Sequence, residues 1–512
     1  MLAHAYCAST FGVDAHLIDV ETNAVNGLPQ YFLVGLPDRA ISESRDRIEA
    51  AIRNSGFEMP RGRITVNLAP ANLPKEGSSF DLPIAVGLLA MSGQISTFRL
   101  RETLILGELA LDGTLRPVKG ILPVTVEAKK RGLKQILIPK ANAKEAAVVS
   151  GVNVFGFTNL SEVIHWLNGQ LETRPVRVDI KRLFENIQKE SPLDFCEVRG
   201  QQNVKRAMEV AAAGGHNIIM VGPPGSGKTM IARRLASILP PLSVEEALET
   251  TRIHSVAGLL SNGTSLVVRR PFRAPHHTIS DAALVGGGSI PKPGEISLAH
   301  NGVLFLDELP EFRRSALEVL RQPLEDGAVT LSRARMSVRY PSRMMLVASM
   351  NPSPGGDWFD PDNPGLTSPE EMHRYMGRVS GPLMDRVDIH VEVHKVNYEE
   401  LSGASPAENS DHIRQRVVTA REFQKKRFER HKGVFNNAQM STRMVREFCR
   451  PDEAGSGLLK KAIANLGLSA RAYDRILKVA RTIADLEKID RVKAHHIAEA
   501  VQYRSLDREQ WR

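Results

Sequence analysis

The eight residues from Gly222 to Thr229 have types and spacing suited to binding phosphate. Their order, Gly-Pro-Pro-Gly-Ser-Gly-Lys-Thr, fits the pattern of a phosphate-binding loop. The glycines allow backbone N–H groups to turn inward around phosphate oxygens, Lys228 can reach the outer phosphates, and the Thr229 hydroxyl can ligate Mg²⁺. The sequence therefore predicts that ATP and Mg²⁺ bind here, and the predicted loop residues are Gly222, Pro223, Pro224, Gly225, Ser226, Gly227, Lys228 and Thr229.

Two adjacent carboxylates, Asp307 and Glu308, follow an apolar run farther along the chain. Such a pair can divide the work of hydrolysis, because one carboxylate supports Mg²⁺ and the other polarises the attacking water. We assign Asp307 to the metal and nucleotide, and Glu308 to the water. An Asp-Glu pair at the end of a strand is common by itself, but its place downstream of a phosphate loop strengthens the assignment.

These side chains need strands to bring them together. The apolar run 218–221 precedes the loop and a helical pattern, 229–239, follows it, which is the strand–loop–helix context of a phosphate loop. The run 303–306 ends at the carboxylate pair, and a further run, 344–350, ends at Asn351. The pattern predicts an α/β nucleotide-binding core.

The first third of the chain alternates short apolar strands with helices, which predicts a separate α/β domain. Helical periodicity covers 40–54 and 122–131. The predicted strands are 17–21, 31–35, 63–67, 103–107 and 135–139.

Two segments of this domain resemble the proteolytic domain of the Lon family. They are 74–81, in which Ser79 matches the nucleophile position, and 113–139, in which Leu122 occupies the position of the catalytic lysine. An alkyl side chain cannot accept the proton of a serine hydroxyl. We therefore expect a Lon-like fold without proteolysis, with Ser79 in a turn or at a helix cap.

The segment 271–280, the phosphate loop, the carboxylate pair and the Lon-like front end together resemble the ComM/YifB magnesium-chelatase-like AAA+ family. The resemblance covers nearly the whole chain. It implies a hexameric ATPase that acts in its characterised branch as a DNA helicase, supporting branch migration in recombination. Relatives often carry cysteines just after the residue that matches Asn351, whereas this chain has none between 351 and 448.

The resemblance also implies three catalytic residues. Asn351 corresponds to the polar sensor that orients water beside Glu308. Arg386 corresponds to an arginine finger for the γ-phosphate of a neighbouring subunit, which implies a ring; the alternative is a local ion pair. Arg471 corresponds to a second-sensor arginine in the helical lid, acting on the same chain's nucleotide, and Arg475 is the alternative occupant.

Two basic segments are candidates for DNA contact. Alternating runs at 328–331 and 336–340 flank a Ser-Arg-Ala-Arg tip and predict a β-hairpin. A cluster of cations also lies on one predicted helix within 411–450. Either segment can instead be an ordinary solvated charged surface. The candidates are Arg333 and Arg335 on the hairpin, and Lys425, Lys426 and Arg427 on the helix.

Composition sets the limits of these interpretations. The chain has 512 residues, a formal net charge of +9 and a pI near 9.4, which is compatible with a polyanionic partner. Its three cysteines are far apart, so neither a disulfide framework nor a thiolate zinc site is indicated. His276 and His277 have no third ligand at a fitting spacing, so we expect this pair to have a structural or subunit-interface role. Without a signal peptide or a long apolar run, we expect a cytoplasmic protein and no membrane partner.

The predicted architecture is α/β: a Lon-like domain at 1–175, an AAA+ core at 190–395 and a helical lid at 396–512. The predicted function is an ATP-driven motor on single-stranded or branched DNA, active in recombination or natural transformation. The motor is expected to be a homo-oligomer, and the family resemblance implies a hexamer. A chelatase-type ATPase that remodels a protein partner without DNA is the alternative. The sequence does not separate the two.

Overall fold

The computed structural model describes residues 2–187, 193–261, 263–288, 291–333, 336–358, 367–396, 408–431 and 433–504. The chain forms two compact units. The first consists of 1–186, 244–268 and 335–339, and the second of 187–243, 269–334 and 340–512. Within the described part of the chain, no helix is long and apolar enough to cross a membrane.

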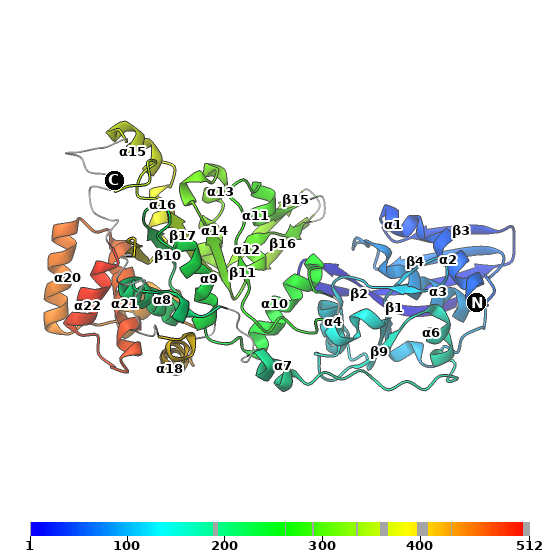
Figure 1. Ribbon diagram of the computed structural model, residues 1–512. Coiled ribbons are helices and arrows are strands. Elements are labelled where there is room, and N and C mark those ends of the chain that lie inside the picture. Colours follow the sequence, from blue (N-terminus) through cyan, green and yellow to red (C-terminus); the bar gives the residue numbers. More distant parts are fainter. Residues whose placement is uncertain are drawn as a thin grey trace. The chain divides into compact units, whose positions relative to one another are not determined.

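The first unit is built on a seven-stranded sheet with the order β3-β4-β2-β1-β5-β8-β9 (Figure 1). All five predicted strands overlap strands of this sheet, namely β2, β3, β4, β5 and β8, but 31–35 runs one residue past β3 and 103–107 runs two residues past β5. The longest hairpin, β1 with β2, was only half predicted. The strands are β1 (Leu2–Phe11), β2 (Asp14–Val25), β3 (Gln30–Val34), β4 (Arg63–Ala69), β5 (Thr103–Ile105), β8 (Gln135–Pro139) and β9 (Asn153–Phe157).

Helices pack against this sheet and supply much of its core. The helix α3 is buried along its whole length, which explains why it shows no amphipathic period in the sequence. The predicted helix 40–54 is interrupted at Glu43 and forms α1 and α2. The helices are α1 (Arg39–Ser42), α2 (Ser44–Asn54), α3 (Asp81–Met91), α4 (Ile121–Lys130), α5 (Ala143–Ala146), α6 (Leu160–Leu167) and α7 (Ile180–Ile187), and a small hairpin joins β6 (Glu108–Leu109) to β7 (Leu115–Arg116).

A helix from the middle of the sequence, α10 (Val244–Ala257), completes the first unit. It packs against α4, where the buried carboxylate of Glu145 accepts hydrogen bonds from the Leu122 backbone N–H at 2.9 Å and from the Ser255 hydroxyl at 2.5 Å. The side chain of Leu122 is fully buried, and Ser79 lies in a single 3₁₀ turn before α3. The absence of proteolysis stays a prediction.

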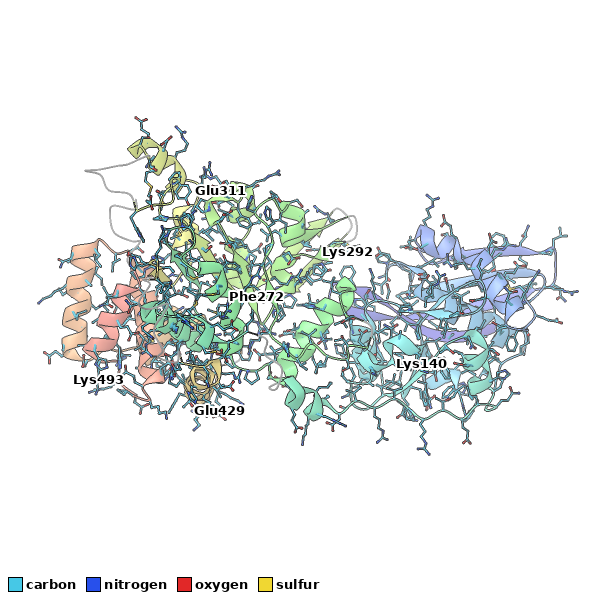
Figure 2. All side chains as sticks on the ribbon, in the orientation of Figure 1. Lys140, Phe272, Lys292, Glu311, Glu429 and Lys493 are labelled. Carbon is cyan, nitrogen blue, oxygen red and sulfur yellow. The ribbon has the colours of Figure 1, made fainter. Side chains whose placement is uncertain are left out.

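The second unit contains a parallel five-stranded sheet with the order β11-β14-β17-β10-β18. Its inner strands are fully buried. Phe272 of β11 stacks on Phe305 of β14, with ring centroids 6.0 Å apart, and Figure 2 labels Phe272 within this unit. The strands are β10 (Ile218–Val221), β11 (Phe272–Arg273), β14 (Val303–Leu306), β17 (Met345–Met350) and β18 (Ile389–Glu392).

Helices flank this sheet, and the predicted hairpin is present as a two-stranded sheet of β15 (Ala328–Arg333) and β16 (Met336–Pro341). A second short hairpin pairs β12 (Gly286–Gly287) with β13 (Lys292–Pro293). The helices are α8 (Gln202–Gly214), α9 (Lys228–Ile238), α11 (Asp281–Val285), α12 (Glu295–Leu298), α13 (Arg314–Glu318), α14 (Arg321–Asp326), α15 (Pro369–Met376) and α16 (Gly381–Met384).

The C-terminal part is helical, as predicted. Apolar residues of these helices join the core around β10 and β17 in one continuous cluster. The linear domain limits drawn from the sequence contain no excursion like that of α10, and they stay predictions. The helices are α18 (Ser410–Arg427), α19 (Thr442–Phe448), α20 (Glu453–Leu466), α21 (Ala470–Leu486) and α22 (Ala494–Gln502).

Candidate nucleotide site

The parallel strands bring the predicted chemistry to one edge of the sheet. Ile218 of β10 pairs with Val347 of β17, and Leu306 of β14 pairs with Ala348. The carboxyl ends of these strands therefore meet, and the phosphate loop, Asp307–Glu308 and Asn351 follow directly from them. In parallel α/β sheets this edge is where ligands bind.

The phosphate loop leaves β10 through glycines that the local geometry requires. A Cβ atom on Gly222 would lie 2.1 Å from the carbonyl oxygen of Val393, so no larger residue fits there. Gly227 has φ of 89° at the start of α9, in the left-handed region that glycine enters without strain. The loop's backbone N–H groups and the N-terminus of α9 thus form the ready anion site that the sequence predicts.

Lys228 lies in the centre of this edge and is largely buried. Its ammonium donates to the carbonyl oxygens of Gly222 at 2.6 Å and Pro223 at 2.9 Å, and to Oδ1 of Asn351 at 3.3 Å. Burial lowers the pKa of Lys228, although the charges of Asp307 and Glu308 oppose that effect. The lysine and the predicted sensor residue therefore share one location.

The two predicted magnesium ligands are in contact. The Thr229 hydroxyl donates to Oδ2 of Asp307 at 2.6 Å, while Oδ1 of Asp307 accepts from the Glu308 backbone N–H at 3.1 Å and from the Ser349 hydroxyl. Hydroxyl and carboxylate oxygens are ligands that Mg²⁺ prefers, completed by waters and nucleotide phosphates. The donor set fits the cation.

Glu308 adopts a left-handed backbone conformation, with φ of 54°. Such a conformation is uncommon for a residue other than glycine and is often found at functional sites. Its half-exposed carboxylate lies 3.6 Å from Nδ1 of His277. Sequence reasoning gave the His276–His277 pair a structural or interface role and missed this contact. The signal was available, since His277 follows the β11 strand that pairs with β14.

A cleft of about 750 Å³ opens beside Glu308 and Asn351. One wall is α15, whose Tyr375 hydroxyl donates to the backbone oxygen of Asn351 at 3.1 Å. Ser368 begins α15 with a capping box, its hydroxyl accepting from the backbone N–H of Glu371. The helix is thus fixed to the residue that is predicted to orient water.

Arg386 lies at the opposite edge of the sheet, where the amino ends of the strands meet. Asn217, directly before β10, donates from its side-chain amide to the backbone oxygen of Arg386 at 3.0 Å. The four residues of β10 separate that point from the phosphate loop, a span of about 13 Å at the usual rise of a strand. Arg386 is 8% exposed, and its guanidinium pairs with Glu325 and donates to the carbonyl oxygen of Pro382 at 2.5 Å. Arg386 therefore does not reach the phosphate loop of its own chain.

The lid arginines lie on the side of Arg386. Arg471 contacts Asp385 at 3.5 Å, and Arg475 pairs with the buried Asp388. The predicted cap of α21 is present, because the Ser469 hydroxyl accepts from Ala472 N at 3.2 Å. The sequence interpretation grouped Arg471 with its own phosphate loop, whereas the structure groups it with the segment that carries Arg386.

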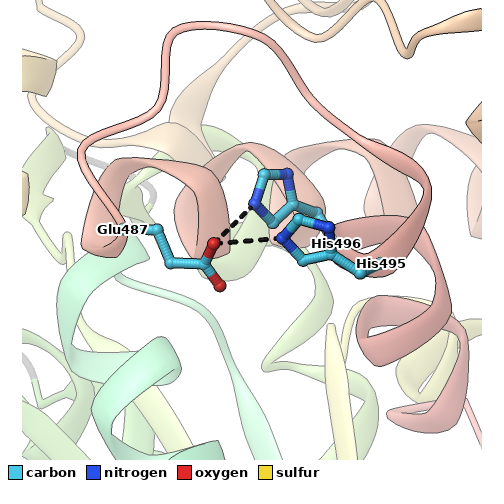
Figure 3. A group of neighbouring side chains, drawn as sticks. All are labelled: Glu487, His495 and His496. Atoms are coloured by element: carbon cyan, nitrogen blue, oxygen red, sulfur yellow. Dashed lines mark hydrogen bonds and ion pairs between the residues drawn. The ribbon is translucent and has the colours of Figure 1, made fainter.

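A histidine cluster in the lid has the composition of a metal site but the wrong proton arrangement. Nε2 of His495 and Nε2 of His496 both lie 3.1 Å from the same Glu487 oxygen (Figure 3). Nδ1 of His496 accepts the Lys493 backbone N–H at 2.9 Å, so its proton resides on Nε2, where a metal would need a lone pair. The cluster is a hydrogen-bonded helix cap.

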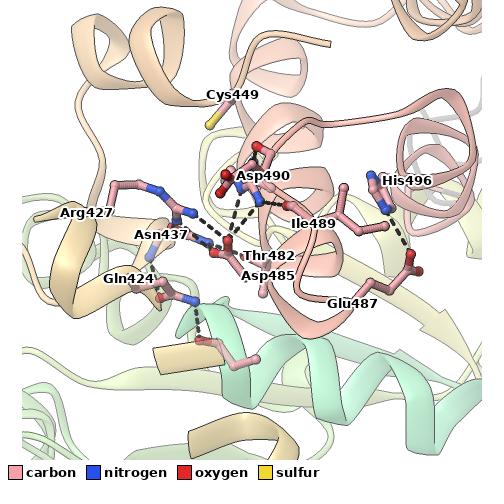
Figure 4. Close-up of polar contacts among 12 residues, drawn as sticks. Gln424, Arg427, Asn437, Cys449, Thr482, Asp485, Glu487, Ile489, Asp490 and His496 are labelled. Atoms are coloured by element: carbon pink, nitrogen blue, oxygen red, sulfur yellow. Dashed lines mark hydrogen bonds and ion pairs between the residues drawn. The ribbon is translucent and has the colours of Figure 1, made fainter. Parts of the chain in front are cut away.

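The DNA candidates differ in their surroundings. Lys425 and Lys426 are exposed on α18, and Arg333 is exposed at the end of β15. Arg427, by contrast, makes two bonds to the buried carboxylate of Asp485, one of them 2.8 Å long (Figure 4). Its guanidinium is thereby committed to the lid core. Arg335 lies outside the described residues.

Comparison with known families covers most of the chain. Residues 20–142 match the family described as "Subunit ChlI of Mg-chelatase". Residues 194–401 match "Magnesium chelatase, subunit ChlI", and 407–504 match "Magnesium chelatase, subunit ChlI C-terminal". The second range contains the phosphate loop, Asp307, Glu308, Asn351 and Arg386, and the third contains Arg471.

Similar proteins align along nearly their whole length. The chain is 45% identical to the competence protein ComM of Haemophilus influenzae, over 99% of this chain and 98% of that protein. It has the same identity and coverage with the protein YifB of Escherichia coli. It is 26% identical to the magnesium-chelatase 38 kDa subunit of Cereibacter sphaeroides, over 32% of this chain and 54% of that subunit.

Proposed function

The chain belongs to the ComM/YifB family of magnesium-chelatase-like proteins, and from that premise we propose that it is an ATPase that works as a ring on DNA. One observation carries the ATPase part. At the carboxyl edge of one parallel sheet, Lys228 is hydrogen-bonded to Asn351 and Thr229 to Asp307, and the Glu308 backbone N–H donates to Asp307. This arrangement supports phosphate binding, metal binding and water activation at one point.

The residues have separate roles in the proposed reaction. The loop N–H groups and Lys228 hold the phosphates, with the ammonium exchanging its carbonyl partners for phosphate oxygens. Thr229 and Asp307 hold Mg²⁺, which when bound supplies positive charge against the phosphates. Glu308 polarises the water that attacks the γ-phosphorus, and Asn351 orients that water.

The ring part of the proposal rests on Arg386 and Arg471. Both lie on the side of the sheet away from their own phosphate loop, and both are held by carboxylates of their own chain. In a ring, the same side of one subunit can face the phosphate loop of the next through a heterologous interface. Each nucleotide site then combines the loop of one subunit with arginines of its neighbour. Six subunits are what the family resemblance implies.

The DNA part rests on charge and on one relative. The chain carries a net charge of +9, with exposed cations at Arg333, Lys425 and Lys426. A close relative is named a competence protein. These observations favour single-stranded or branched DNA as the partner, in recombination or natural transformation, with helicase or branch-migration activity. The magnesium-chelatase relatives favour the second candidate, an ATPase that remodels a protein partner without DNA.

The two candidates are separated by measuring ATP turnover of the full chain with and without single-stranded or forked DNA. Stimulated turnover and DNA binding that weakens with salt support the motor on DNA. Turnover that ignores DNA, together with no salt-sensitive binding, supports the remodelling ATPase. The Glu308→Gln variant is the control for both, since it is expected to bind ATP without hydrolysing it.

A further inference from the structure

The cleft beside Glu308 holds more charge than the proposed reaction uses. Its lining includes six ionisable side chains, three of them acidic and three basic: His277, Glu308, Glu311, Glu371, Arg374 and Arg378. Figure 2 labels Glu311 at this edge of the second unit. Of these six side chains, only Glu308 has a role in the proposed hydrolysis of ATP.

Most of these groups are already paired across the cleft. Glu308 faces His277 at 3.6 Å, and Arg378 donates to Glu311 at 3.1 Å. The Glu371 carboxylate closes the capping box of α15 by accepting the Ser368 backbone N–H at 3.0 Å. Each carboxylate of the cleft therefore has a partner of its own.

Arg374 differs from the other charged side chains of the cleft in lacking a partner within the described part of the chain. Among the residues that the structure describes, its guanidinium has neither a hydrogen bond nor an ion pair, although it lines the same cleft. Its side chain is exposed, but the helix that carries it is held in place, because the next residue, Tyr375, is buried and its hydroxyl donates to the backbone oxygen of Asn351. A cation on an anchored helix that lines the cleft and has no partner among the described residues is suited to binding an anion.

The identity of that anion follows from the neighbours. Asn351 accepts from Lys228, the residue that reaches the outer phosphates, and Glu308 is the proposed water activator. We propose that Arg374 binds the terminal phosphate of ATP, in the same chain as the phosphate loop. The inference rests on the proposed ATPase function. It adds a catalytic arginine that is distinct from Arg386, which lies at the opposite edge and is buried against Glu325.

The chemistry of arginine fits this role. A guanidinium presents planar paired donors that match two phosphate oxygens, and its charge offsets the negative charge on the equatorial oxygens during transfer. ADP lacks the terminal phosphate. Arg374 is therefore expected to distinguish ATP from ADP, which a residue that only stabilises α15 would not do.

The test compares nucleotide affinities in a Glu308→Gln background of the full chain, so that ATP persists. Arg374→Gln is expected to weaken ATP binding about tenfold, or about 1.4 kcal/mol, and to leave ADP binding within about twofold. The ATP affinity of Arg374→Lys should lie between that of the Glu308→Gln parent and that of Arg374→Gln. His373→Gln, an exposed position on the same helix outside the cleft lining, is the matched control and should change neither affinity.

The possible outcomes separate this inference from its premise. Equal losses for ATP and ADP would assign Arg374 a structural role and overturn the inference, as would unchanged ATP binding. Inorganic phosphate serves as a third probe: loss of its binding alone, with ATP unaffected, would assign Arg374 to the product and also overturn the inference. If the Glu308→Gln parent bound neither nucleotide, the ATPase proposal itself would fall.

Discussion

The placement of Arg386 predicts that two inactive variants restore each other's activity. Lys228→Ala removes the phosphate-binding ammonium, and Arg386→Ala removes the arginine finger, which is worth about 10³- to 10⁵-fold in kcat in related phosphoryl-transfer enzymes. Each variant alone should therefore show at most about 0.1% of the parent's turnover. Arg386 lies about 13 Å or more from its own loop, so the two defects fall in different nucleotide sites.

The fraction of ATP turnover that should return follows from how the two variants mix in a ring. In a ring assembled at random from equal amounts of the two variants, a site is intact only where an Arg386→Ala subunit supplies the loop and a Lys228→Ala subunit supplies the arginine. That combination occurs at about one interface in four, because interfaces of a ring are head-to-tail. The mixture should recover about a quarter of the parent's ATP turnover.

The assay is steady-state ATP hydrolysis after the purified variants are mixed, at a concentration at which the parent is fully assembled. The matched control mixes Lys228→Ala with Glu308→Gln. Both residues lie at the carboxyl edge of one chain, so no interface is intact and no activity should return. A test mixture that recovers no more activity than the control would refute the placement of Arg386 in a neighbour's site, and so would an Arg386→Ala protein that is fully active alone.

Four further outcomes follow from individual contacts. Asp485→Ala leaves buried guanidinium groups unpaired and should lower the free energy of unfolding by about 3–5 kcal/mol in urea titrations. Burial disfavours the charge on Asp388, but Arg475 and His216 outweigh it and lower its pKa; its contribution to stability is present above about pH 4 and is lost as the pH falls, so Asp388→Asn should flatten that part of the acid-unfolding curve. Gly222→Ala forces a Cβ against Val393 O and should abolish ATP binding measured by fluorescence titration. Replacing Lys425 and Lys426 with glutamine should reduce the salt slope of DNA binding by about one to two, without changing turnover in the absence of DNA.

The chemistry at the carboxyl edge was accessible from the sequence because it is local. A phosphate loop can be recognised from eight consecutive residues, and Asp307, Glu308 and Asn351 each follow the end of an apolar run. Parallel pairing then brings those ends together without further information. For the same reason five of the seven strands in the first unit's sheet were predicted, since their apolar runs are bounded by polar turns, whereas β1 and β9 were not predicted.

Other features depend on contacts between distant parts of the chain and left no local signal. Arg427 looked like one more cation in a basic helix, but Asp485, 58 residues later, binds it in the lid core. The side of the sheet on which Arg471 lies follows from Asp385. The helix α3 is apolar all round, and such a helix has no period to detect.

The excursion of α10 affects how the chain is made. Synthesis proceeds from the N-terminus, and domains fold as their residues emerge. The first unit, however, includes residues 244–268 and 335–339, so it lacks α10 while α8, β10 and the phosphate loop are already outside the ribosome. Its buried apolar cluster, by contrast, is drawn from residues 3–167. Over that interval α4 lacks its contact with α10, and the buried Glu145 carboxylate lacks the hydrogen bond from the Ser255 hydroxyl. A truncated chain ending near residue 186 is then expected to be less stable to urea than a chain reaching past residue 268, because it leaves the buried Glu145 carboxylate without the Ser255 hydroxyl. A segment from the middle of the sequence thus completes a unit that the N-terminal residues begin.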